Sequence, residues 1–99
     1  MKGETVLGKR VKFVFYGDGK KYSDRFFIKQ KALELGLKGS CRLNSEKQLV
    51  VEVEGRSVSV DEFITFIQKG VSSHMGTTEL SMEIFHTLKD YTTMESDIV

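Results

Sequence analysis

The sequence predicts a single α+β domain in which two helices cover one face of an antiparallel sheet. Two observations carry this prediction. Segments with the two-residue period of a strand alternate with segments that have the 3.6-residue period of a helix, and glycines or polar turns separate them. The chain has 99 residues, enough for one modest core that needs no disulfide or metal. We therefore treat residues 1–99 as one domain.

Four strands are predicted from alternating side chains. Residues 10–16, RVKFVFY, direct β-branched and aromatic side chains to two faces in turn. Residues 39–44 and 48–54 form a hairpin around the polar turn SEK, and its second strand directs Glu52 and Glu54 to the face opposite its apolar residues. The fourth strand contains the alternating residues Leu80, Met82 and Ile84.

The first helix is predicted over residues 24–35. Its apolar residues recur at helical spacing, and Gly36 stands where a left-handed cap ends a helix. The predicted inner face consists of Phe27, Ile28, Ala32 and Leu35.

The start of the second helix is predicted from a capping box, in which Ser59 is followed three residues later by Glu62. Val58 and Phe63 are spaced to form a hydrophobic staple around it. Gly70 is expected to end the helix. Its buried stripe consists of Val60, Phe63, Ile64 and Ile67.

The resulting order, βαββαβ, is that of a ferredoxin-like sandwich, with an antiparallel sheet and both helices on one face. The tail, residues 91–99, can add a short fifth strand at an edge of the sheet. Many unrelated functions use this arrangement, so function has to be argued from sites.

Composition excludes several classes of protein. No apolar run approaches the length of a membrane-spanning helix, and the N-terminal segment lacks the apolar core of a signal peptide, so we expect a soluble, cytoplasmic protein without membrane contact. The single cysteine, Cys41, cannot form an internal disulfide and is interpreted as a small core residue. With His74 and His86 far away in the sequence, it gives no metal-ligand spacing, so we expect no metal and no cofactor.

The charge is unevenly distributed. The first 42 residues contain eleven Lys or Arg and four acids, whereas the remainder contains four and ten. Strands from both halves interleave in the predicted sheet, so this difference need not produce a charged face. RNA recognition motifs share the strand order, but their third strand is basic and aromatic, whereas here LVVEVEG is aliphatic and acidic. Nucleic acid is therefore disfavoured as a partner.

Several spaced residues resemble those of a known family. Gly17 and Arg25 bound the stretch GDGKKYSDR, LGLKG occupies residues 35–39, and VEVEG occupies residues 51–55. They resemble the acylphosphatase family, whose motifs are G-x-V-Q-G-V-x-F-R and G-(aromatic)-V-(R/K/Q)-N-x-x-x-G-x-V-x-x-x-x-x-G. The match runs without a gap over residues 11–55.

The resemblance implies a phosphate site. In that family the loop amides and the arginine bind the phosphate of an acyl phosphate, and the asparagine orients the attacking water. Arg25 is accordingly the candidate catalytic cation, because a guanidinium can bind two phosphate oxygens at once. A cation in the first turn is unfavourable for the helix dipole, which favours a ligand-binding role for Arg25. Alternatively, Arg25 can pair with Asp24 or Glu34. The implied anion-binding residues are Gly17, Asp18, Gly19, Lys20, Lys21, Tyr22 and Arg25.

The sequence departs from the family at the asparagine. That position falls on Leu43, which cannot hydrogen-bond water and shares strand parity with Cys41, so its simplest role is in the core. The neighbouring Asn44 points to the opposite face unless a bulge intervenes.

The loop also departs from the family. It lacks the second glycine of the motif, which Gly19 replaces only two places early, and the acids Asp18 and Asp24 offset Lys20 and Lys21.

Two functions follow from these residues. The first is a binding module without enzymatic activity, or nearly so, that retains a weak phosphate site and acts through a protein partner. The alternative is an acylphosphatase that hydrolyses acyl phosphates to carboxylate and phosphate.

Overall fold

The computed structural model describes residues 8–16, 22–46, 48–71 and 80–96 of the chain. Along the chain the elements are β1 (Gly8–Phe15), α1 (Tyr22–Glu34), β2 (Lys38–Leu43), β3 (Leu49–Arg56), α2 (Ser57–Phe66), the π-helical turn η1 (Ile67–Val71), β4 (Leu80–Phe85) and β5 (Met94–Ser96). In the described part of the chain, no helix is both long enough and apolar enough to cross a membrane.

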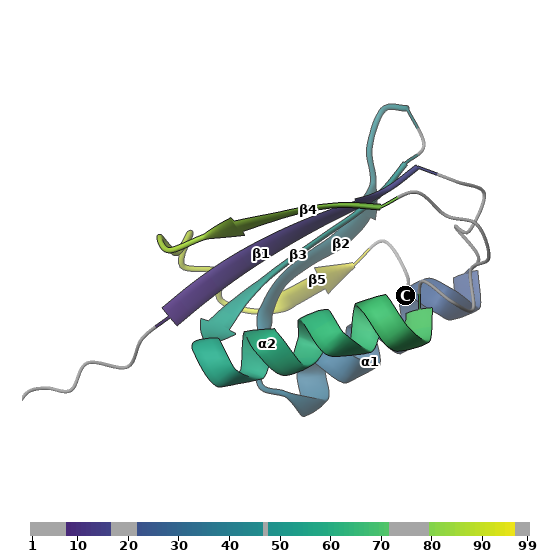
Figure 1. Cartoon of the computed structure of the whole chain (residues 1–99). Coiled ribbons are helices and arrows are strands. Elements are labelled where there is room, and N and C mark those ends of the chain that lie inside the picture. Colours follow the sequence, from purple (N-terminus) through teal and green to yellow (C-terminus); the bar gives the residue numbers. More distant parts are fainter. Residues whose placement is uncertain (1–7, 17–21, 47, 72–79, 97–99) are drawn as a thin grey trace, which may run out of the picture.

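The strands form one sheet in the order β4-β1-β3-β2-β5, and both helices lie on one face of it (Figure 1). The predicted βαββαβ sandwich is therefore confirmed, as is a fifth strand at an edge. The sheet is mixed rather than wholly antiparallel, because β5 pairs parallel to β2. The direction of β5 follows from the topology: β4 ends at the same end of the sheet at which β2 begins, so the returning chain enters β5 in the direction of β2.

The core lies between the sheet and the helices. Phe13 of β1 and Phe63 of α2 have ring centroids 6.2 Å apart. Ile28 of α1 belongs to the same buried cluster. The predicted common core of both helices is confirmed, and Cys41 is fully buried in it.

Helix α1 begins two residues earlier than predicted and ends at Glu34, one residue earlier than predicted, and the left-handed conformation expected at Gly36 is confirmed. Gly36 has a φ of 72°, and the Leu37 amide donates to the Ala32 carbonyl at 2.8 Å, which closes the last turn. The predicted inner face was wrong at one residue, since Phe27 is 58% exposed. Ile28 and Ala32 define the buried stripe, and Phe27 lies a helical step of about 100° away from it.

The predicted capping box of α2 was wrong. β3 continues to Arg56, so the helix begins at Ser57, with Arg56 in extended conformation as its N-cap and no side-chain cap bond. Ser59 and Val58 therefore lie inside the helix, where Val58 is 64% exposed and makes no staple. Gly70 does not end the helical segment as predicted: α2 ends at Phe66, and the π-helical turn η1 that follows it continues through Gly70 to Val71.

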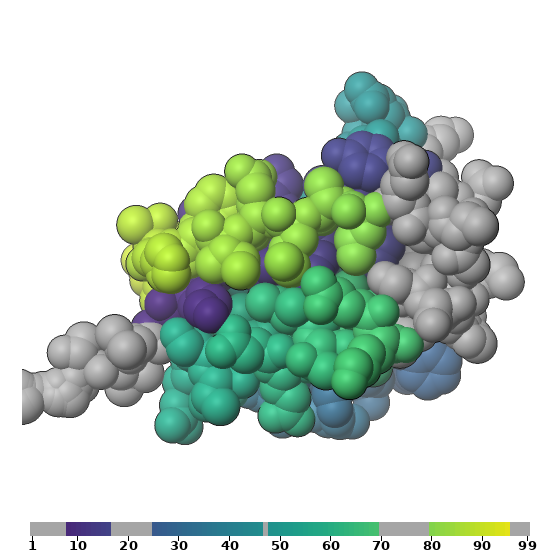
Figure 2. Space-filling view, in the orientation of Figure 1, coloured from purple at the N-terminus to yellow at the C-terminus, as the bar shows by residue number. Residues whose placement is uncertain are grey.

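The edge strand β4 leaves apolar side chains partly uncovered. Met82 and Ile84 pair with Phe13 and Val11 and so share their helix-facing side, yet they are 39% and 44% exposed. The reason is that α2 packs under β1 and β3 rather than under the edge. Figure 2 shows this surface, with β4 in yellow-green above α2 in teal.

The other face of the sheet carries the largest departure from expectation. Glu52 and Glu54 do point away from the helices as predicted, but each is only 5% exposed, because the chain between β4 and β5 covers them. Glu52 accepts hydrogen bonds from Arg10 Nη1 at 2.5 Å, Lys89 Nζ at 3.0 Å and the Tyr91 hydroxyl at 2.5 Å. This cluster, Glu52 with Arg10, Lys89 and Tyr91, is called the Glu52 cluster below.

Glu54 fixes the backbone of the same covering segment. Its two carboxylate oxygens accept from the backbone amides of Lys89 at 2.7 Å and Tyr91 at 2.9 Å. Two adjacent acids of β3 thus hold one segment by its side chains and by its main chain. Together they attach the segment that leads into β5.

We expect Glu52→Gln to lower the free energy of unfolding by about 3 kcal/mol at pH 7, because it leaves the buried Arg10 guanidinium without a compensating charge. Urea denaturation measures this loss. Glu62→Gln, on the exposed side of α2, is the matched control and should change stability by less than about 0.5 kcal/mol. Equal effects of the two changes would contradict the role given to the Glu52 cluster.

The Glu52 cluster also predicts a pH dependence. Burial by itself raises the pKa of Glu52, but hydrogen bonds from Tyr91, Lys89 and Arg10 outweigh it and hold that pKa below its ordinary value of 4.5. A depressed folded-state pKa contributes stability above the unfolded pKa, and this contribution is lost as the pH falls through the folded-state value. The stability difference between the wild type and Glu52→Gln, measured in urea, should therefore be constant near neutrality and shrink at acidic pH. A difference independent of pH would contradict it.

Candidate functional site

Arg25 and Leu43 lie at the same end of the molecule. β1 and β2 both end opposite Leu49 of β3, and α1 starts from the end at which β1 finishes. Arg25, in the first turn of α1, is partly buried. The fold therefore brings to one end of the sheet the two positions that the family resemblance assigns to phosphate and water.

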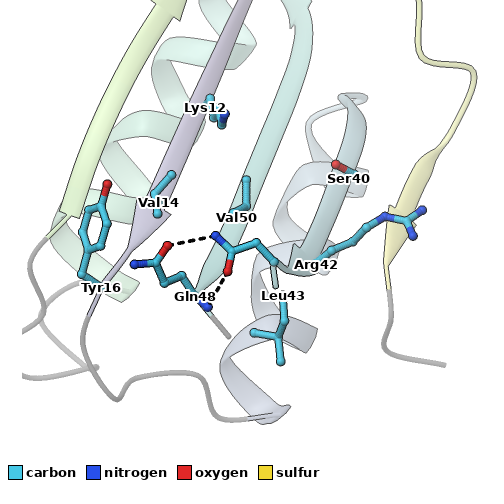
Figure 3. Close-up of a pocket in the computed structure, with 9 residues that line it drawn as sticks. Lys12, Val14, Tyr16, Ser40, Arg42, Leu43, Gln48 and Val50 are labelled. Atoms are coloured by element: carbon cyan, nitrogen blue, oxygen red, sulfur yellow. Dashed lines mark hydrogen bonds between the residues drawn. The ribbon is translucent and has the colours of Figure 1, made fainter. Parts of the chain in front are cut away.

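Leu43 is not a core residue, contrary to the sequence-based expectation. It shares the helix-facing side of β2 with Cys41, but it is 37% exposed. In Figure 3 its side chain projects away from the other labelled side chains. The cause is its position at the last residue of β2, beyond the part of the sheet that the helices cover fully.

Asn44 lies on the other face and is engaged in the β2–β3 turn. Its Oδ1 accepts from the backbone amides of Glu46 and Gln48, each at 2.9 Å, and its Nδ2 donates to Gln48 Oε1 at 2.9 Å. The pairing of β2 with β3 runs without a bulge from Lys38 to Leu43. Asn44 therefore does not substitute for the family asparagine at the position of Leu43.

Most of the predicted anion loop lies outside the described residues. This holds for Gly17, Asp18, Gly19, Lys20 and Lys21. Tyr22 is described as the first residue of α1. Of the two acids proposed as partners of Arg25, Glu34 forms an ion pair with Lys31 instead, with Nζ and Oε1 3.6 Å apart.

Sequence reasoning missed a hollow of about 390 Å³ on the face of the sheet opposite the helices (Figure 3). Val14 and Val50 pair across β1 and β3 and form its floor. The signal that could have found it is that these two residues are apolar at positions where the same strands otherwise place polar side chains. The surrounding residues are Lys12, Tyr16, Ser40, Arg42, Leu43, Asn44 and Gln48.

The described residues contain no group of three His, Cys, Asp or Glu side chains placed to hold a metal ion. The chemistry that their arrangement offers is hydrogen bonding and charge. The positive charges of Arg25 and of Lys12, in the hollow, both favour anions.

The fold agrees with a comparison against protein families. The family model described as Acylphosphatase matches residues 11–93. The chain therefore belongs to the acylphosphatase family. The comparison with curated proteins gives no match.

Solved structures of similar fold include two acylphosphatases. The acylphosphatase from Bacillus subtilis is 13% identical, with a TM-score of 0.72 over 89% of this chain and 97% of that one. An acylphosphatase from Coxiella burnetii is 16% identical, with a TM-score of 0.71 over 91% and 93% of the two chains. At these identities the likeness concerns the fold.

A third similar structure is full-length HypF in a phosphate- and nucleotide-bound form. It is 21% identical, with a TM-score of 0.73, and the match covers 96% of this chain but 12% of HypF. The same fold thus occurs as a small part of a much longer protein.

We expect Asn44→Ala to lower the free energy of unfolding by about 1 kcal/mol, because the turn loses the acceptor for two backbone amides. Asn44→Asp keeps an acceptor oxygen and should cost less. Urea denaturation of both variants measures the difference. An unchanged midpoint for Asn44→Ala would show that its side chain is not committed to the turn.

Proposed function

We propose that this chain is a binding module of the acylphosphatase family that retains a weak phosphate site at Arg25 and the preceding loop, with little or no hydrolysis of acyl phosphates. The observation that carries the proposal is Leu43 at the position of the family asparagine. The chain is proposed to act by binding a protein partner. The occurrence of this fold within the longer HypF chain supports such a modular use.

The physical reason concerns water rather than phosphate. Hydrolysis of an acyl phosphate requires little covalent work from the protein, so the rate depends on positioning the water and stabilising charge. A leucine side chain has no donor or acceptor with which to orient water. The amide side chain next in sequence, that of Asn44, already makes three hydrogen bonds within its turn and lies on the other face of the sheet.

The second candidate is acylphosphatase activity. It is favoured by family membership and by the exposure of Leu43, which leaves that end of β2 open to solvent rather than sealed in the core. In that case, groups near Arg25 other than residue 43 would orient the attacking water.

Hydrolysis of benzoyl phosphate separates the two candidates. We expect the purified chain to stay near the uncatalysed rate, because nothing at residue 43 orients water. Turnover on the order of 10 per second, ordinary for an enzyme, would establish the second candidate instead. Leu43→Asn restores the family residue at a partly exposed position and should raise the rate above that of the unmodified chain.

Phosphate binding tests the retained site. In a phosphate titration the amide resonances of residues 17–25 should shift together with millimolar affinity, roughly 4 kcal/mol. Arg25→Ala should abolish this response, whereas Lys38→Ala, at the opposite end of β2, should preserve it.

Salt distinguishes a site from general attraction, because exposed charges are screened within about 10 Å at 0.1 M salt. Scattered shifts that vanish with added sodium chloride would refute a phosphate site. They would mean that residues 16–27 hold no specific anion site.

A further inference from the structure

The face of the sheet opposite the helices is divided into a covered and an open half. The covered half contains the rows of Glu52 and Glu54, over which the segment with Lys89 and Tyr91 is fixed. The next row of paired residues on this face, nearer the ends of β1 and β2, is that of Val50. It pairs with Val14 of β1 on one side and with Arg42 of β2 on the other. No described segment covers that row, and the hollow lies there.

The open half has an apolar floor and polar walls. Val14 and Val50 are both partly exposed in the absence of a covering group. Tyr16, 47% exposed, stands on one side in Figure 3, and Gln48 lies between it and Val50. The hollow of about 390 Å³ falls within the usual size range of small-molecule sites, roughly 300 to 1,000 Å³. A flat apolar body can therefore lie on the two valines beside the tyrosine ring.

The hollow also contains an ammonium group without an ion-pair partner among the described residues, that of Lys12. Two acids flank it in the sheet register. Glu52 is committed to the Glu52 cluster, and Glu83 of β4 is exposed and forms no ion pair with it within the described part of the chain.

The second cation of the hollow is Arg42, whose Nη2 lies 2.5 Å from Glu95 Oε1 of β5. That ion pair already neutralises its charge. One positive charge, that of Lys12, is thus left to attract a ligand, and it lies beside the apolar floor.

We propose that this hollow, which we call the open-sheet site, binds a small flat apolar anion with a single charge, such as an aromatic carboxylate. The ring lies on Val14 and Val50, and the carboxylate accepts a hydrogen bond from the Lys12 ammonium. A monoanion matches Lys12, the cation of the hollow that forms no ion pair within the described part of the chain. The open-sheet site is built by described residues alone, and its apolar floor and Lys12 lie on the face of the sheet opposite the helices. Leu43 borders it at the end of β2, whereas Arg25 is not among its lining residues.

The probe is 2-naphthoate, with 2-naphthalenemethanol as a neutral molecule of the same shape. Titration of the ¹⁵N-labelled chain should shift the amide resonances of residues 12–16, 40–44 and 48–50 with affinity on the order of millimolar, as expected for a ligand of this size. The neutral alcohol should bind about tenfold more weakly, because it lacks the charge.

Two lysine variants test whether the charge of Lys12 binds the carboxylate, since each removes one lysine from the same face of the sheet. Lys12→Gln should weaken naphthoate binding about tenfold while leaving the affinity for the neutral alcohol unchanged. Lys38→Gln removes the same charge from β2 at the covered end of the sheet and should change naphthoate affinity by less than about twofold. The resonances outside the hollow show whether each variant keeps the fold.

Three outcomes would overturn the proposal: no shifts in the named segments, equal binding of the acid and the alcohol, or equal weakening by the two lysine variants. Arg25→Ala separates this site from the phosphate site. It should leave naphthoate binding intact, and loss of naphthoate binding in that variant would mean that the ligand occupies the other face.

Discussion

The arrangement of the sheet depends on one buried carboxylate. Glu52, near the middle of the face that the helices leave uncovered, brings Arg10, Lys89 and Tyr91 together. A buried carboxylate is tolerated only when donors replace the water it has lost, and here three side chains supply them. The same contacts direct the chain after β4 across the sheet to the opposite edge, where β5 pairs with β2. The topology sets the direction of β5, and the contacts of Glu52 hold the segment that leads into it.

This covering segment determines which surfaces remain for function. It occupies only one half of the face opposite the helices, and no other described segment covers the half around Val14 and Val50. On the helix-facing side, the ends of β1 and β2 lie level, so Arg25 and Leu43 come to the same end of the domain. The two anion sites that we propose therefore use different cations, Arg25 in the first turn of α1 and Lys12 on β1.

Membership of the acylphosphatase family favours hydrolysis of acyl phosphates, whereas a leucine at the asparagine position assigned by the resemblance favours binding without hydrolysis. The sequence resemblance assigns the family's cation to Arg25, but it assigns the asparagine position to Leu43, and Asn44 stabilises its own turn. Binding an anion requires only donors and charge, whereas hydrolysis also requires an oriented water. A chain can therefore lose the second ability and retain the first, which is why binding is the function proposed for Arg25.

The sequence by itself determined the elements and their order, because alternation in β1 and β3 and the helical stripe with Gly36 are local patterns that packing reinforces. It also determined the family. It misjudged the start of α2, since continued pairing of β3 with β1 up to Arg56 replaced the local capping signal of Ser59. The burial of Glu52, the parallel β5 and the hollow on Val14 and Val50 were decided only by the tertiary structure. Each depends on which distant strands become neighbours, and the period of a single strand gives the face of a residue but not what covers that face.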